Sequence, residues 1–133
     1  MVATHASDSG ERRRSASAEI SNRLVRLMRE WTGRGPTKAR TYIHDDLVVC
    51  VLQDTLTKGE RALADHGQEN TVLASRRAGQ SLMREEATAM IEEVLSRRVV
   101  SFMSDNATDP DIACEIFVLE SRPVAKDAQS VAE

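Results

Sequence analysis

The short apolar run Leu47–Leu52 (LVVCVL) limits the fold of this chain more than any other feature of the sequence. The run is far shorter than the ~20 apolar residues of a membrane-spanning helix, and its valines predict a β-strand. Alternate side chains of a strand point to opposite faces of a sheet, and here both sets are apolar. A strand with one solvated face would alternate apolar and polar residues. The sequence therefore predicts that both faces of this strand are covered.

A second strand-like segment, Ile112–Leu119, has a related pattern. One set of alternate residues is wholly apolar: Ile112, Cys114, Ile116 and Val118. The other set is only partly polar: Ala113, Glu115, Phe117 and Leu119. Helices of the same chain could cover both faces, or a partner could cover one. Because the chain offers one long, one medium and one short helix, and monomers rarely expose large apolar patches, we expect a homodimer or hetero-oligomer formed through the apolar sheet face.

Apolar residues at helical spacing predict three helices. The first, Ser15–Trp31, ends before a turn rich in Gly and Pro. The second begins at Thr57, which forms a capping-box pattern with Glu60, and ends at Gly67. The third is the longest and spans about residues 70–97.

Two pairs of extended segments complete the pattern. Lys38–His44 and Leu47–Gln53 form one predicted hairpin, and Val99–Ser104 and Ile112–Leu119 form the other, joined by the loop Asp105–Asp111. The order helix, strand, strand, helix, helix, strand, strand predicts an α+β fold with a four-stranded antiparallel sheet packed against helices. A duplicated unit of one helix and two strands would give this order, and two independent hairpins are the alternative.

The 133 residues suffice for one packed domain, which we place at residues 15–120. Residues 1–14 and 121–133 lack apolar periodicity and are expected to be disordered tails. The chain shows no secretory signal, so the cytoplasm is the expected compartment. Both cysteines, Cys50 and Cys114, lie in strand-like runs and are predicted to be free structural thiols.

The turn Gly33–Arg40 concentrates cations, glycines and a hydroxyl group. Its candidate residues for partner or anion binding are Arg34, Thr37, Lys38 and Arg40. The turn closes a helix and feeds a strand, so it is not a P-loop, and plain helix termination is the alternative interpretation. A net charge of −3 and an aromatic content of 3% make nucleic acid an unlikely partner.

Acidic residues gather at both hairpin connections. One connection carries His44, Asp45 and Asp46, and the other carries Asp105, Asp109 and Asp111, with Glu115 nearby. These oxygens could bind a hard cation only if the two connections were neighbours, and turn formation by Asp is the alternative. We therefore expect no metal site, with Asp45, Asp46, Asp109 and Asp111 as the weak candidates. No catalytic constellation is recognisable, and neither enzymatic activity nor a cofactor is expected.

Two stretches, GRGPTKARTYIHDDLVVCVLQDTLTKGE and RRVVSFMSDNATDPDIACEIFVLE, resemble a family of small bacterial domains. The matching positions include Gly35-Pro36-Thr37, Tyr42-Ile43, Leu56-Thr57, Phe102-Met103-Ser104, Pro110-Asp111, and Glu115 with Phe117-Val118-Leu119. Over about residues 18–120 the chain is similar to the MpsC type of Na+-translocating membrane-potential-generating-system proteins.

The resemblance implies a non-enzymatic accessory or regulatory protein of a membrane system that moves cations or bicarbonate. Because the chain has no membrane-spanning run, we expect an accessory part that reaches the membrane through a partner, not a translocator. Two other functions remain as alternatives. One is a nucleotide- or nucleic-acid-binding regulator that uses Arg12–Arg14 and the Gly33–Arg40 turn, and the other is a metal-dependent enzyme that uses the acidic hairpin connections.

Overall fold

The computed structural model describes residues 4–121, with the side chains of residues 4–9 left out. Its elements are α1 (Thr4–Thr32), β1 (Lys38–His44), β2 (Leu47–Gln53), α2 (Lys58–Asp65), α3 (Glu69–Leu95), β3 (Val99–Thr108) and β4 (Asp111–Leu119). The strands form one antiparallel sheet of order β1-β2-β4-β3. The predicted α+β fold and order of elements are confirmed.

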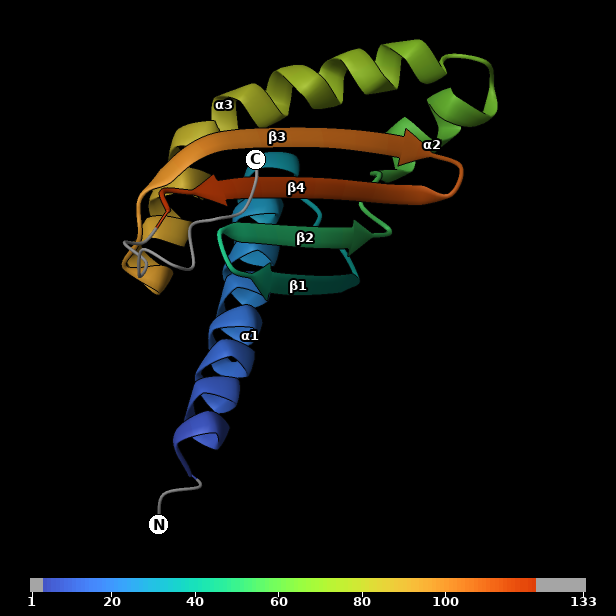
Figure 1. Ribbon diagram of the computed structural model, residues 1–133. Coiled ribbons are helices and arrows are strands. Elements are labelled where there is room, and N and C mark those ends of the chain that lie inside the picture. Colours follow the sequence, from blue (N-terminus) through green and yellow to red (C-terminus); the bar gives the residue numbers. More distant parts are fainter. Residues whose placement is uncertain (1–3, 122–133) are drawn as a thin grey trace, which may run out of the picture.

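The two long helices lie on the same face of the sheet (Figure 1). Helix α1 packs against β1, α3 packs against β3, and the two helices also contact each other. The core between helices and sheet includes Leu24 and Met28 from α1, Ile91 from α3, and Leu52 and Phe117 from the strands. The core contains most of the apolar stripe that predicted the first helix, whereas Trp31, at the end of that stripe, is 44% exposed.

The topology relates the two halves of the chain. Strands β2 and β4 pair in the middle of the sheet, and β1 and β3 lie at its edges. Each half therefore contributes a helix, an outer strand and an inner strand, with the helix packed on its own outer strand. A duplicated unit of one helix and two strands would produce this arrangement.

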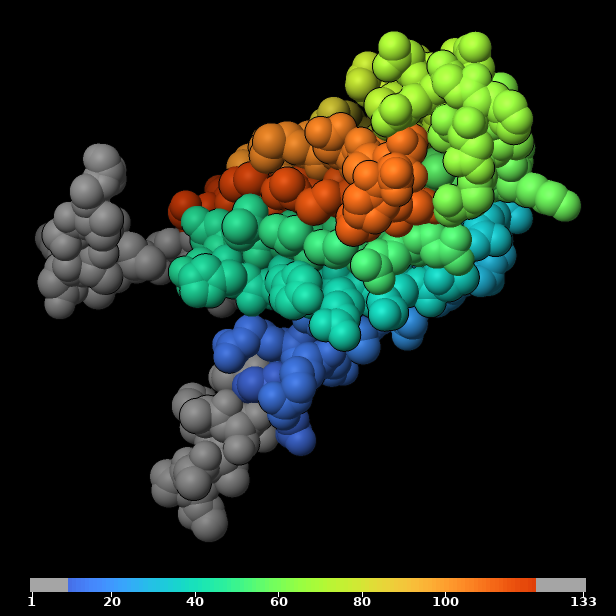
Figure 2. Space-filling model, turned by 90° about the vertical axis from the view of Figure 1, so that its right-hand side faces the viewer, coloured from blue at the N-terminus to red at the C-terminus, as the bar shows by residue number. Residues whose placement is uncertain are grey.

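The first helix is longer than its apolar pattern indicated, since it begins at Thr4 and not at Ser15. The side chains of residues 11–14 are exposed, so this part buries no stripe from which a helix could be recognised. Its N-terminal turns extend beyond the sheet (Figures 1 and 2). Residues 1–3 and 122–133, which make up the rest of the expected tails, lie outside the described residues.

The predicted loop Asp105–Asp111 is wrong for most of its length. Strand β3 continues to Thr108, and β4 begins at Asp111. Polar residues are accommodated on the helix-facing side of this hairpin because they find partners on α3. The Thr108 hydroxyl donates to Glu69 at 2.7 Å, and the Asn106 side chain donates to Gln80 at 2.9 Å. Figure 2 shows the β3–β4 turn (orange) against the α2 region (green).

The strands of the first hairpin and the start of α2 match the prediction. Strands β1 and β2 have the predicted bounds. At the start of α2, the Thr57 side chain accepts from the backbone N–H of Glu60, and the Glu60 side chain accepts from that of Thr57. Helix α2 ends before Gly67, whose φ of 82° is readily adopted only by glycine.

Candidate interaction surface

The face of the sheet opposite α1 and α3, here called the open face, is covered by no helix of the described chain (Figure 1). It is built from alternate residues of the four strands. These are Lys38, Arg40, Tyr42 and His44 of β1; Leu47, Val49, Val51 and Gln53 of β2; Ile112, Cys114, Ile116 and Val118 of β4; and Ser101, Met103, Asp105 and Ala107 of β3.

The strand register aligns these residues in rows across the sheet. One row is apolar on all four strands and consists of Tyr42, Val49, Ile116 and Met103. Tyr42 and Met103, at its two ends, are 53% and 49% exposed. The neighbouring row contains Leu47, which is 40% exposed. The centre of the open face is therefore a contiguous apolar surface, of the kind that marks a binding site.

The helices cover only one of the two apolar faces that the sequence predicted. Their side holds Val48, Cys50 and Leu52 of β2 and the partly polar set of β4, all of which are buried. The wholly apolar set of β4 lies on the open face and is only half-buried. A partner on the open face stays a prediction, and the described helices do not supply the cover.

The two edges of the open face carry opposite charges. Lys38 and Arg40 lie on the β1 edge, and Asp105 lies on the β3 edge. Arg40 and Asp105 belong to the same row, which also contains Val51 and Cys114. All three charged residues are exposed, and none makes an ion pair within the part of the chain that the structure describes.

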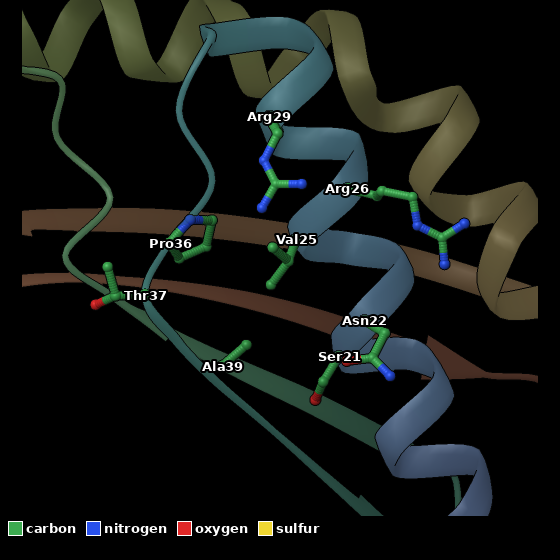
Figure 3. A pocket seen from close by; sticks show the side chains of 8 residues that line it. All are labelled: Ser21, Asn22, Val25, Arg26, Arg29, Pro36, Thr37 and Ala39. Carbon is green, nitrogen blue, oxygen red and sulfur yellow. The ribbon is translucent and has the colours of Figure 1, made fainter.

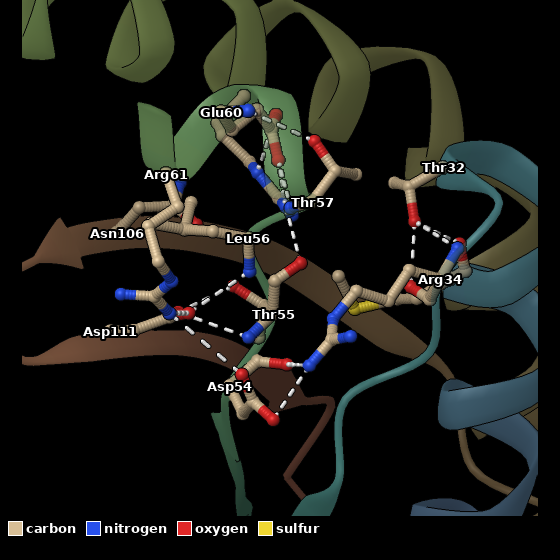
Figure 4. A network of polar contacts seen from close by, with 12 residues as sticks. Thr32, Arg34, Asp54, Thr55, Leu56, Thr57, Glu60, Arg61, Asn106 and Asp111 are labelled. Carbon is tan, nitrogen blue, oxygen red and sulfur yellow. Dashed lines mark hydrogen bonds and ion pairs between the residues drawn. The ribbon is translucent and has the colours of Figure 1, made fainter. Parts of the chain in front are cut away.

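The four candidate residues of the Gly33–Arg40 turn do not form one cluster. The guanidinium of Arg34 is paired with the Asp54 carboxylate at 2.6 Å (Figure 4). Strand alternation then separates the other three, because Lys38 and Arg40 lie on the open face and Thr37 lies on the helix side.

Thr37 lines a shallow pocket between α1 and the turn, with a volume of about 360 Å³. The pocket is lined by Ser21, Asn22, Val25, Arg26, Arg29, Pro36, Thr37 and Ala39. Figure 3 shows the Arg29 side chain directed into it and the Arg26 side chain directed away, towards α3. The Ser21 hydroxyl is hydrogen-bonded to Thr41 at 2.8 Å. Arg29 and Thr37 are among the groups that an anion could reach there.

The acidic hairpin connections lie at opposite ends of the sheet, so the condition for a shared cation site is not met. Asp45 and Asp46 connect β1 to β2 beside the end of β4, whereas Asp109 and Asp111 lie at the other end of β4. Asp46 is paired with Arg97 at 3.3 Å. Among the side chains that the structure describes, those of residues 10–121, no group of three or more His, Cys, Asp or Glu residues is placed to hold a metal ion.

Asp111 has a structural role at its end of the sheet (Figure 4). One carboxylate oxygen accepts from the backbone N–H and the hydroxyl of Thr55, each at 3.0 Å. The other accepts from the backbone N–H of Leu56 at 3.0 Å and from the guanidinium of Arg61 at 2.8 Å. The carboxylate therefore ties β4 to the segment that leads into α2. Asp109, in the same turn, is exposed.

A buried polar cluster under α3 was not predicted from the sequence. Gln80 donates from its side-chain nitrogen to the Glu115 carboxylate at 3.1 Å and to Asn106 at 3.2 Å. One turn earlier, Arg76 contacts the Glu60 carboxylate at 2.6 Å. Burial raises the pKa of Glu115 to about 7, against the opposing effects of Ser104, Gln80 and Arg76. The only sequence signal for this cluster was a Glu on a strand face that is otherwise apolar.

The two cysteines are free, as predicted, and lie on opposite faces of the sheet. Burial raises the pKa of the Cys50 thiol to about 12, so this group stays protonated in the core. Cys114 lies on the open face and is partly exposed, and burial also raises its pKa. Neither thiol has the lowered pKa of a reactive nucleophile.

Fold and surface together define a class: α+β domains with a four-stranded sheet that helices cover on one face only. The chain belongs to the MpsC family, because the model of the family described as "Na+-translocating membrane potential-generating system (MpsC)" matches residues 12–121. The resemblance seen in the sequence is thereby confirmed.

A relative in Bacillus subtilis (strain 168), the uncharacterized protein YrhF, is 24% identical over 106 residues, which cover 78% of this chain and 87% of that protein. No solved structure matches. Over the described residues, no helix is both long and apolar enough to cross a membrane.

Proposed function

We propose that this protein acts without catalysis, as an accessory or regulatory component of a membrane system that generates membrane potential or transports cations or bicarbonate. It works in the cytoplasm and reaches the membrane system through protein–protein contact at the open face. The family description supports the association with a membrane-potential system. The open face supports the mode of action.

The observation that carries the proposal is the apolar row of the open face. Tyr42, Val49, Ile116 and Met103 extend across all four strands without a charged residue. Aromatic residues and Met are enriched in protein–protein interfaces, whereas charged residues are depleted from interface cores. The charges of the open face lie at its edges, as in an interface with an apolar centre and a polar rim.

The test is complementation of a deletion strain, with membrane potential measured by a voltage-sensitive dye. Ile116→Asp places a charge at the centre of the open face and should fail to restore the potential that the wild-type chain restores. The matched control is Leu82→Asp, because Leu82 is 66% exposed and lies on α3, away from the open face. Both variants are first checked for native circular dichroism. Full restoration by Ile116→Asp would contradict the proposal.

A second candidate is the binding of a nucleotide or nucleic acid at the Gly33–Arg40 turn. One observation favours it: Thr37 and Arg29 line the same pocket beside this turn. Calorimetric titration with inorganic phosphate tests it, and binding that weakens with added salt and with Arg29→Gln would support it. A heat of phosphate binding that is the same in Arg29→Gln as in the wild type would contradict it.

A further inference from the structure

We propose that the open face binds a second copy of this chain, packed face to face about a two-fold axis that runs along the strands. This inference rests on the proposed function, which assigns protein–protein contact to the open face, and it names the partner. Two sheets that pack face to face keep their strands within about 30° of each other, with about 10 Å between the sheets. An aligned two-fold dimer then has its axis either along the strands or across them.

The edge charges select the axis along the strands. Rotation about that axis places β1 of one copy over β3 of the other. It leaves the position of each row along the strands unchanged. Arg40 then lies opposite Asp105 of the second copy, because these residues share a row at opposite edges of the sheet. Symmetry makes the contact twice, so two ion pairs flank the apolar centre.

The axis across the strands gives the opposite result. It would place β1 over β1 of the second copy, and so bring Lys38 and Arg40 together with the same cationic edge. It would also leave Asp105 without a basic partner. Like charges brought together at an interface are strongly unfavourable, so this arrangement is disfavoured.

The apolar centre also fits the axis along the strands. In this arrangement β2 covers β4 of the second copy, and each row lies over the equivalent row of the second copy. Val49 lies over Ile116 and Val51 lies over Cys114 of the second copy, so apolar groups meet apolar groups. At the edges of the apolar row, Tyr42 lies over Met103, and sulfur and aromatic rings attract each other.

The size of the open face is adequate for a stable dimer. Seven-residue strands that rise about 3.3 Å per residue, in four strands about 4.8 Å apart, span roughly 23 Å by 19 Å. Two such footprints of ~400 Å² give ~800 Å² of planar area in the dimer, and the accessible area of the projecting side chains is larger, which places the contact near the ~1,000 Å² in total that a specific interface clears.

The experiment is sedimentation velocity on the full chain and on two charge reversals, Arg40→Glu and Asp105→Arg. The wild-type chain should sediment as a dimer, with twice the 14.7 kDa mass of one chain. Each reversal alone creates two repulsive contacts and should raise the dimer Kd by about tenfold or more at low salt. An equimolar mixture of the two variants should dimerise again, because both contacts become attractive.

The controls separate this geometry from general effects. The double variant Arg40→Glu/Asp105→Arg should dimerise like the wild type, which shows that neither change prevents folding. Arg77→Glu reverses an exposed charge on α3 and should leave the Kd unchanged. In about 1 M salt, where the Debye length is about 3 Å, the single variants should approach the wild-type Kd.

Three outcomes would overturn the proposal. A monomeric wild-type chain contradicts the second copy, and a mixture that stays monomeric contradicts the axis. A chain ending at Ser121 that dimerises when the full chain does not would show that residues 122–133 occupy the open face. A monomer whose Ile116→Asp variant still fails to restore membrane potential would overturn only the dimer, whereas a dimer whose Ile116→Asp variant restores it would overturn only the proposed function.

Discussion

Replacement of Glu115 by glutamine should stabilise the protein at neutral and alkaline pH. The Glu115 side chain is 1% exposed and lies under α3, where it accepts from the side-chain nitrogen of Gln80 at 3.1 Å. A glutamine has the same shape, and its amide oxygen can accept the same hydrogen bond. Its NH2 group can donate to the buried hydroxyl of Ser104, directly across on β3. The variant thus removes a charge without opening a cavity.

The magnitude follows from the pKa of Glu115, which burial raises from 4.5 to about 7. Below pH 4.5 the carboxyl group is protonated in both the folded and the unfolded chain and costs no stability. As the pH rises from there to about 7, the unfolded chain releases its proton first, so stability is lost. At about 1.36 kcal/mol per pKa unit, the full loss is about 3 kcal/mol.

The charged and titratable groups around Glu115 are few. Arg76 of α3 favours the carboxylate, and the thiol of Cys50, directly across on β2, stays protonated because its pKa is raised to about 12. The pH dependence therefore belongs to Glu115 itself.

The assay is urea unfolding of the wild type and Glu115→Gln at about pH 5 and about pH 8. One fixed protein concentration is used, because the proposed self-association would stabilise the folded chain. Contributions of all other groups cancel in the difference between the two proteins. The stability of the variant relative to the wild type should rise by about 2.5 kcal/mol between these pH values. A difference that does not change with pH would refute the buried, proton-binding carboxyl group.

Three further predictions concern stability and reactivity. Asp111→Ala leaves buried donors unpaired and should lower the free energy of unfolding by about 3 kcal/mol, whereas the exposed Asp109→Ala should change it little; equal effects in urea unfolding would contradict the assigned role of Asp111. Gly35→Ala brings a Cβ within 3.1 Å of a side-chain carbon and 3.2 Å of a carbonyl oxygen of α1, so it should lower the melting temperature. Gly79→Ala in α3 meets no atom within 4 Å and should raise the free energy of unfolding by about 1 kcal/mol. A stabilised Gly35→Ala would show that the turn does not approach α1 so closely. Cys114 should react with a thiol reagent more slowly as the protein concentration rises, because the proposed second copy would cover it, and a rate independent of concentration would argue against that cover.

Secondary structure was predictable from the sequence where local signals determine it. The bounds of β1 and β2 and the capping box at Thr57 depend on residues that are neighbours in the chain. The extension of β3 was not predictable, because polar residues such as Asn106 are held in the strand by partners on α3, 26 residues away in the sequence. The same composition, without those partners, would favour a turn.

The candidate site was only partly predictable for the same reason. A cluster in sequence suggested that Arg34, Thr37, Lys38 and Arg40 act together, but the Asp54 contact of Arg34 and the alternation of β1 separate them in space. The relation between Arg40 and Asp105 was hidden because it requires the strand order and the register of three pairings. The apolar character of both faces was visible because it lies within single strands.

The orientation of β4 supports the proposal that a second copy buries the open face. With the opposite orientation, the wholly apolar set of β4 would face the helices, and Glu115 would lie in water without a desolvation cost. The observed orientation instead buries Glu115, at a cost of about 3 kcal/mol near neutral pH, together with Phe117, whose ring lies 4.9 Å from that of Phe102. In a lone subunit, Ile116 and Val118 remain partly exposed, so they gain less stability than full burial would give. Between the helices and a second sheet, both sets of β4 are buried, and only then does an outward apolar set contribute fully to stability.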